Sequence, residues 1–235
     1  MIDMIEAAQD FGWYWWTCSA IAFLAGSLPF GVIIARRRGV DIRKEGSGNP
    51  GATNVGRVLG RRFGILCFLL DALKGAVPVL VAGWLGGLLG ETSTTNAAAW
   101  GWLLVAVSAI LGHCFSPWIG FRGGKGVATG FGAVLAMWPV LTVPALAAFV
   151  VWGITLGLTR LMSLASMAGA IVLPATVIAM AIAGEGESLG RSIPYLVVTG
   201  LIAAFVVFRH RKNLVRLRAG SEPKLDGSTS EPASK

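Results

Sequence analysis

Long apolar stretches dominate this sequence and restrict what it can fold into. Three of them, residues 13–35, 63–86 and 161–183, are long enough to cross a bilayer, because a helix rises 1.5 Å per residue and about 20 residues are needed. Residues 97–115 and 193–208 are shorter candidates. Hydrophobic residues make up 54% and charged residues 14% of the chain, a composition outside the usual range of soluble proteins. We therefore expect an all-α integral membrane protein.

A further apolar run, residues 127–158, is interrupted between Pro139 and Pro144. We interpret it as two short helices joined by a tight turn, which gives seven transmembrane helices in all. Small residues and a proline in the first span, from Gly26 to Gly31, predict close helix packing and a kink whose freed backbone groups are satisfied by neighbouring helices.

The formal charge of +8 is distributed unevenly between alternate loops. Basic residues gather in residues 36–62, in residues 122–125, at Arg160 and in residues 209–218, whereas acidic residues dominate the N-terminus and the other loops. The positive-inside rule then places the N-terminus outside and the C-terminus in the cytoplasm. The acidic N-terminus has no basic region typical of a cleaved signal peptide, so we expect it to be retained.

The first basic loop carries a glycine-rich segment, residues 46–57, that predicts half of an anion site. We expect Asn49 to be the N-cap and Pro50 the first residue of a short amphipathic helix that runs through Arg57. Such a helix start directs backbone N–H groups toward a phosphate. Ser47 adds a hydroxyl and Arg57 a planar fork that matches phosphate oxygens. The expected phosphate-contacting residues of this segment are Gly48, Asn49, Gly51, Thr53 and Asn54.

The glycines of this segment also match a dinucleotide fingerprint, Gly46-x-Gly48-x-x-Gly51, with Asp71 downstream. That fingerprint requires a preceding strand. Here a membrane span and a basic loop precede the glycines, so nucleotide binding is rejected.

A second glycine-rich cluster, residues 112–129, supplies the other half of the predicted site. Gly123, Gly124 and Gly126 allow backbone amides to approach an anion, and Lys125 brings a positive charge. The spacing is not that of a Walker A sequence, so ATP hydrolysis is not supported. For His113, a structural hydrogen bond is favoured over a role as base or ligand.

Two further basic segments complete the cytoplasmic set, and one span carries buried charges. Ser163 follows Arg160 at a helix start, and His210 and Asn213 share a helical face that can turn inward, while Arg209 is interpreted as a solvated anchor. Asp71 and Lys74 lie on one face of the second span, where either a mutual ion pair or a supporting role beside the site would explain them.

Together these clusters resemble the acyl-phosphate-dependent glycerol-3-phosphate acyltransferases of bacterial membranes, the PlsY type. Residues 47–57 resemble the first motif of that family, residues 112–129 the second and residues 210–222 the third. The resemblance implies transfer of a fatty acyl group from acyl phosphate to the 1-hydroxyl of sn-glycerol 3-phosphate, which gives lysophosphatidate and phosphate, the first step of phospholipid synthesis. It also implies a multi-pass protein of the bacterial inner membrane, with its active site facing the cytoplasm.

The resemblance assigns roles to particular residues. The expected catalytic residues are Ser47, Arg57, Lys125, His210 and Asn213. Ser163 joins the phosphate-binding set, and Glu222 ties the C-terminal cluster in place. We expect one membrane domain over residues 1–218, with catalytic loops at residues 36–62, 112–129, 159–163 and 209–222, and a disordered polar tail over residues 223–235.

The chemistry expected from these residues involves no covalent enzyme intermediate, because none of them stands out as an activated nucleophile. Binding and orientation of two phosphate-bearing substrates would supply much of the catalysis, and the phosphate of the donor would take the hydroxyl proton. The three cysteines lie in apolar stretches without metal-site spacing, so we expect no metal and no cofactor.

The expected partners are glycerol 3-phosphate, acyl phosphate and membrane lipid, and we expect a monomer that does not bind nucleic acid. A transporter of glycerol 3-phosphate is the alternative. It is less favoured because the polar clusters lie in loops rather than near the bilayer midplane, and because the two halves show no repeat.

Overall fold

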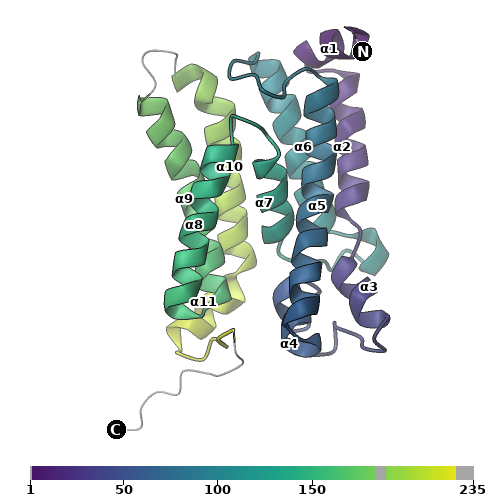
Figure 1. Ribbon diagram of the computed structural model, residues 1–235, viewed down its shortest axis with the longest axis vertical. Coiled ribbons are helices and arrows are strands. Elements are labelled where there is room, and N and C mark those ends of the chain that lie inside the picture. Colours follow the sequence, from purple (N-terminus) through teal and green to yellow (C-terminus); the bar gives the residue numbers. More distant parts are fainter. Residues whose placement is uncertain (1, 184–188, 226–235) are drawn as a thin grey trace.

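The computed structural model describes residues 2–183 and 189–225, and in these residues the fold is all-helical. Six of its helical segments are long and apolar enough to cross a membrane, and Figure 1 shows them running side by side. The helices are α1 (Ile2–Gln9), α2 (Trp13–Gly26), α3 (Phe30–Arg36), α4 (Ala52–Leu59), α5 (Arg61–Leu85), α6 (Asn96–Cys114), α7 (Val127–Leu135), α8 (Thr142–Thr159), α9 (Met162–Ala183), α10 (Leu189–Arg209) and α11 (Arg211–Arg218). Glu185 and Glu187, two of the acidic residues in the loops predicted to face outward, lie outside the described residues.

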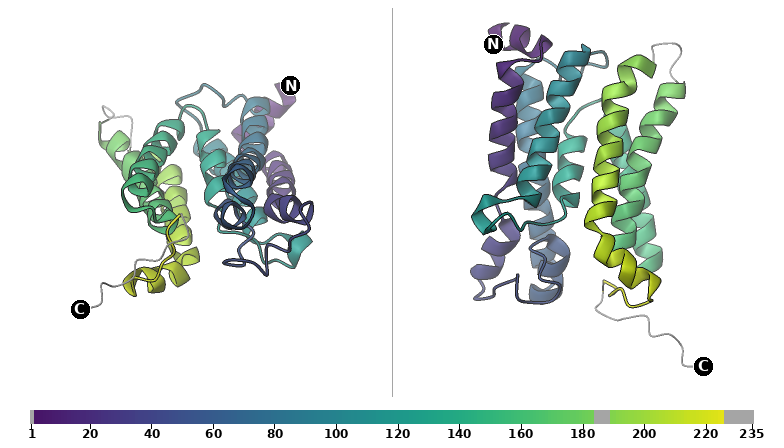
Figure 2. Two further views of the ribbon diagram at one scale, coloured as in Figure 1. Left: turned by 60° about the horizontal axis from the view of Figure 1, so that its bottom comes forward. Right: turned by 180° about the vertical axis from the view of Figure 1, so that it is seen from behind.

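The helices form two groups that stand next to each other (Figure 2). The N-terminal group holds α2 to α7, and the C-terminal group holds α8 to α11. The two groups meet where α6 packs against α10 and α7 against α8. Helices α4 and α11 lie at the same end of the two groups, opposite α1 (Figure 1). We call this the basic end, because the arginine-rich segments 36–62 and 209–218 lie there.

The predicted kink in the first span is a full break. Helix α2 ends at Gly26 and α3 begins at Phe30. Two groups from other helices satisfy the carbonyls that the break frees: the Ser116 hydroxyl donates to the Ser27 oxygen at 2.6 Å, and Lys74 Nζ donates to the Leu28 oxygen at 2.6 Å. Neighbouring side chains therefore take over the backbone hydrogen bonds, as the membrane interior requires.

The interruption predicted within residues 127–158 also occurs, but the two helices are unequal. Helix α8 has 18 residues and is one of the six candidate spans, whereas α7 has only 9. At 1.5 Å per residue α7 is about 13 Å long, too short to cross a bilayer alone. The glycine-rich loop that carries Lys125 precedes α7. The count of seven spans and the orientation in the membrane stay predictions.

At the end of the bundle opposite the basic end, the interior consists of large apolar side chains. Trp15, Trp102 and Met137 are fully buried there with Tyr14 and Leu141. In contrast, the buried polar side chains Asn54, Asn213 and Glu222 belong to the segments of the basic end. The polar interior therefore lies where the sequence places the loop motifs.

Candidate anion-binding site

Helix α4 begins later than the sequence suggested. Its N-cap is Gly51 rather than Asn49, and its first residue is Ala52. The prediction for Asn49 and Pro50 is therefore wrong. The Asn49 side chain instead accepts a hydrogen bond from the Gly51 N–H at 2.9 Å, an Asx turn that competes with capping. The helix still carries Arg57 in its last turn.

The buried side chain of Asn54 holds the loop before α4 in place through hydrogen bonds. Its side-chain oxygen accepts from the Ser47 N–H at 2.8 Å, and its amide nitrogen donates to the carbonyls of Ile42 and Glu45 at 3.2 and 3.0 Å. Asn54 is only 2% exposed, whereas Ser47 is exposed. The Asn54 side chain thus holds the loop, and any effect on a phosphate passes through the position of Ser47.

A chain of hydrogen bonds joins the two helical groups at the basic end. Lys125 Nζ donates to Asn213 Oδ1 at 2.6 Å, and Asn213 Nδ2 donates to Glu222 Oε1 at 2.6 Å. The same carboxylate oxygen accepts from the Ser163 hydroxyl at 2.7 Å, and the other oxygen accepts from Arg216 Nε at 2.7 Å. The three side chains predicted from separate loops, Lys125, Asn213 and Ser163, are therefore brought together around Glu222, in the structural role expected of that residue.

Arg57 reaches the same place from α4. Its Nη2 donates to the carbonyls of Pro223 and Lys224 at 3.1 and 3.5 Å, while its buried Nε has no hydrogen-bond partner in the described part of the chain. Leu225 N–H donates to the Arg160 carbonyl. Residues 223–225 are therefore placed by contacts, and their assignment to a disordered tail is wrong. Residues 226–235 of that predicted tail lie outside the described residues.

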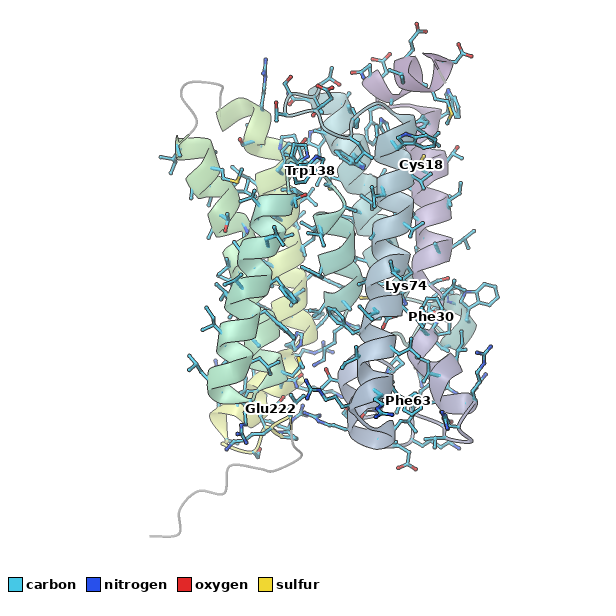
Figure 3. All side chains as sticks on the ribbon, in the orientation of Figure 1. Cys18, Phe30, Phe63, Lys74, Trp138 and Glu222 are labelled. Carbon is cyan, nitrogen blue, oxygen red and sulfur yellow. The ribbon has the colours of Figure 1, made fainter. Side chains whose placement is uncertain are left out.

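Figure 3 relates this cluster to the whole molecule. Glu222 lies at the basic end, level with Phe63 on the other helical group, and Lys74 lies deeper in the bundle. Cys18 and Trp138 are near the opposite end. The cluster therefore sits between the two groups, next to one surface of the bundle.

His210 is buried with a defined hydrogen bond. Its Nδ1 lies 2.8 Å from the Val206 carbonyl, which fixes the proton on Nδ1 because a carbonyl can only accept. Nε2 is then left with a lone pair. Burial and, next, the charge of Lys125 lower the pKa of His210 to about 4. His210 is therefore neutral at physiological pH and a weak base.

Lys125 and Glu222 are shifted in ways that follow from their surroundings. Burial lowers the pKa of Lys125 to about 8, against the opposing charge of Glu222 and with the help of Arg216, Arg209 and Arg57. Burial raises the pKa of Glu222, but the hydrogen bonds from Asn213, Ser163 and Arg216 outweigh this and hold it below the usual value. Burial likewise lowers the pKa of Arg57, which remains a cation. The cluster thus has an excess of positive charge and suits an anion.

Arg209 belongs to the site, contrary to its interpretation as a solvated anchor. It ends α10, and its Nη2 donates to the carbonyls of Gly123 and Gly124 at 3.3 and 2.5 Å. Sequence reasoning missed it because one arginine in a basic run looks like any other. Its position directly before the inward-facing His210 was the available signal.

Asp71, Lys74 and His113 form a buried charged group beside the glycine loop. Lys74 Nζ lies 2.7 Å from Asp71 Oδ1, so the mutual ion pair, one of the two interpretations of these residues, is present. His113 Nδ1 lies 3.7 Å from that oxygen and makes no hydrogen bond in the described residues, so the structural hydrogen bond expected for His113 is absent. Together with Gly124 they line a cavity of about 10 Å³, room for a single water molecule.

The remaining predicted residues lie in two separate segments of the N-terminal helical group. The described hydrogen bonds link none of Ser47, Gly48, Gly51 or Thr53 to the Lys125 cluster, while Gly123, Gly124 and Gly126 lie beside it in the loop that carries Lys125. Within residues 2–183 and 189–225, no group of three or more His, Cys, Asp or Glu side chains could hold a metal ion. The site is an assembly of amides, hydroxyls and cations.

Fold and site thus define a multi-span membrane protein with a cationic, glycine-lined cluster at one end, which is the candidate anion site. Comparison with known proteins agrees. The family model "Glycerol-3-phosphate acyltransferase" matches residues 16–220. A glycerol-3-phosphate acyltransferase of Anaeromyxobacter sp. (strain Fw109-5) is 44% identical over 207 residues, 88% of this chain and 94% of that protein. The one of Thermosynechococcus vestitus is 41% identical over 213 residues, 88% of this chain and 93% of that protein.

Solved structures show the same similarity. The crystal structure of PlsY (YgiH), an integral membrane glycerol 3-phosphate acyltransferase, in its glycerol 3-phosphate form has a TM-score of 0.76 and 35% identity, covering 89% of this chain and 94% of that one. The lysophosphatidic acid form has a TM-score of 0.72, 36% identity and the same coverage. The chain therefore belongs to the glycerol-3-phosphate acyltransferase family.

Proposed function

We propose that the protein transfers a fatty acyl group from acyl phosphate to the 1-hydroxyl of sn-glycerol 3-phosphate, and that the site faces the cytoplasm of a bacterial inner membrane. The observation that carries this proposal is the cluster of Arg57, Lys125 and Asn213 at the meeting point of the two helical groups. In such a place a phosphate from water and an acyl chain from lipid can meet.

The two phosphate groups would be held by different kinds of donor. Arg57 offers a planar fork and Lys125 a point charge, and both suit phosphate oxygens. Gly123, Gly124 and Gly126 allow the loop backbone to approach an anion closely. That one related structure is a glycerol 3-phosphate form and another a lysophosphatidic acid form supports substrate and product sharing one site.

The proposed step forms one ester bond and breaks one acyl–phosphate bond. The 1-hydroxyl oxygen attacks the acyl carbonyl carbon, the bond from that carbon to the phosphate oxygen breaks, and inorganic phosphate leaves. The hydroxyl proton goes to the departing phosphate. A phosphate group bound through one oxygen has a second pKa near 6, and the departing inorganic phosphate is more basic still. It is therefore a stronger base than His210, whose pKa is about 4.

His210 then has an orienting role. Its free Nε2 lone pair can accept a hydrogen bond from the substrate hydroxyl, which aligns the attacking oxygen. The Ser163 hydroxyl donates to Glu222, whose pKa is held below the usual value by its hydrogen bonds. So weak a base does not activate a nucleophile, which supports a direct transfer without an acyl-enzyme. Amide and cationic donors aimed at the developing oxyanion would each contribute about 3 to 4 kcal/mol in a site of this type.

The deciding experiment is a reconstitution. Purified protein in lipid vesicles is mixed with acyl phosphate and glycerol 3-phosphate, without coenzyme A, and lysophosphatidate is measured. We expect equimolar lysophosphatidate and phosphate. Absence of product from folded protein would contradict the enzymatic proposal, and product formed from acyl-coenzyme A alone would contradict the proposed donor. The relatives are acyltransferases, which favours the enzymatic proposal over transport. Sedimentation in detergent tests the further proposal that the protein is a monomer.

A further inference from the structure

We infer that Arg209 is a positioning residue that turns two peptide groups of the glycine loop so that their N–H groups face the bound phosphate. The inference rests on the proposed function, because it assigns a cause to the geometry of that phosphate site. It concerns residues 123–125 and the arginine at the end of α10.

The evidence is the pair of carbonyls that Arg209 holds. Its Nη2 donates to the Gly123 and Gly124 oxygens. In a trans peptide plane the C=O and the following N–H point in opposite directions. The N–H groups of Gly124 and Lys125 therefore point away from Arg209. Neither donates a hydrogen bond in the described residues.

The loop is also confined by the C-terminal end of α6. The Gly123 N–H donates to the Cys114 carbonyl at 3.1 Å. A β-carbon at Gly123 would overlap the His113 carbonyl, and one at Gly124 would overlap the His113 imidazole. Because α6 packs directly against the two glycines, the loop cannot move that way. The hydrogen bonds from Arg209 Nη2 to the two carbonyls then determine how the peptide planes are rotated.

A guanidinium suits this task better than an ammonium. One planar nitrogen donor group contacts two successive carbonyls, whereas lysine is a point charge on a flexible stem. Arg209 also lies over the Phe115 ring, 5.9 Å from its centroid, which limits its motion. Its contacts connect α10 of one helical group to the loop of the other. The orientation of the two amides therefore depends on how the groups dock.

The test compares Arg209→Lys with Arg211→Lys as the matched control. Arg211 is exposed, and it donates to the carbonyl of Phe208, three residues earlier. Glycerol 3-phosphate binding is measured by calorimetry without donor, and KM and kcat are measured separately. Loss of one or two charge-assisted hydrogen bonds predicts about tenfold weaker binding and a similar rise in KM for Arg209→Lys, with kcat changing far less. Arg211→Lys should match the unmodified protein.

A second variant separates orientation from charge and covers a failure of Arg209→Lys to fold. Arg209→Ala is assayed with added methylguanidinium or with added methylammonium. We expect methylguanidinium alone to restore binding. Equal rescue by both cations, unchanged affinity in Arg209→Lys, or a lowered Tm with unchanged affinity would each overturn the inference. Since binding is measured without turnover, failure of the acyl phosphate assay would leave this result intact.

Discussion

Lys125 and His210 are two buried bases of one cluster, and burial favours the neutral form of both. Their charge states at pH 7 still differ, because the ordinary pKa of lysine is much higher than that of histidine. Lys125, with a pKa of about 8, is still largely charged at pH 7, whereas His210, with a pKa of about 4, is not. At the residue scale the site therefore combines one titrating cation with a neutral hydrogen-bond acceptor.

The titration of Lys125 predicts an alkaline limb in the pH profile. The charged amine attracts phosphate, and the charged fraction falls as pH rises through about 8, so kcat/KM should fall about tenfold per pH unit above that value. In Lys125→Arg the guanidinium stays charged, and the fall should disappear up to pH 10. A profile unchanged by Lys125→Arg would contradict the assignment.

The variant Arg57→Lys tests whether the planar guanidinium of Arg57, the second cation of the cluster, is needed for phosphate binding. The variant keeps the charge but loses the planar donors that now reach Pro223 and Lys224. We expect KM for the phosphate-bearing substrate to rise about tenfold, the effect of one or two lost charge-assisted hydrogen bonds. Steady-state kinetics at saturating donor measures this. Arg62→Lys, at the exposed start of α5, is the control.

Most of the site could be predicted because the residue types alone indicate which side chains can bind a phosphate. Arg57, Lys125 and Asn213 are polar groups in three loop motifs, and the positive-inside rule places those motifs on one side. Two details could not be predicted. The Asn49 side chain has a choice between capping and an Asx turn, and that choice depends on the path of the loop. The contacts of Arg209 depend on how α10 docks.

At the element scale, the break between α2 and α3 shows how a span tolerates a proline. The Ser116 hydroxyl, only 1% exposed as a residue, donates to the Ser27 carbonyl. Ser116→Ala should leave that carbonyl unsatisfied and reduce the free energy of unfolding by about 1–3 kcal/mol. Thermal unfolding in detergent measures the loss. Ser93→Ala, at an exposed loop position, should leave Tm unchanged.

The presence of the long apolar helices was easier to predict than where the shorter helices begin and end. Apolar length identified α5, α6, α9 and α10 directly, because a bilayer imposes that length on any helix. The unequal lengths of α7 and α8 escaped prediction because both halves of the run 127–158 are apolar, and the interruption between Pro139 and Pro144 does not show where each helix begins. The start of α7 is set by Gly126, which has a positive φ of 83°, and its depth is set by the loop packed on His113.

At the scale of the whole molecule, hydrogen bonds join the two helical groups at the basic end. Glu222 accepts from Asn213, which in turn accepts from Lys125. Glu222→Ala should release Asn213, Ser163 and Arg216 together, and activity should fall at least 100-fold, since breaking a buried charged network costs about 3–5 kcal/mol.

The control for Glu222→Ala is its neighbour Lys224. Lys224 contributes only its backbone carbonyl to Arg57, so Lys224→Ala should retain activity. The initial rate of lysophosphatidate formation measures both variants. Equal losses in the two would mean that the segment acts through its general placement and not through the carboxylate.

The short helix α8 has a consequence for the surrounding lipid. Its 18 residues measure about 27 Å, while the 25 residues of α5 measure about 37 Å. A hydrocarbon core of about 30 Å does not match both lengths equally, and tilting of a longer helix or thinning of the bilayer beside a shorter one accommodates such a difference. Leu158, 82% exposed, marks where α8 ends, four residues before the helix that carries Ser163. Local thinning there would draw lipid headgroups inward, so that the activated end of a fatty acyl donor is brought level with the protein's cations while its tail stays in the membrane.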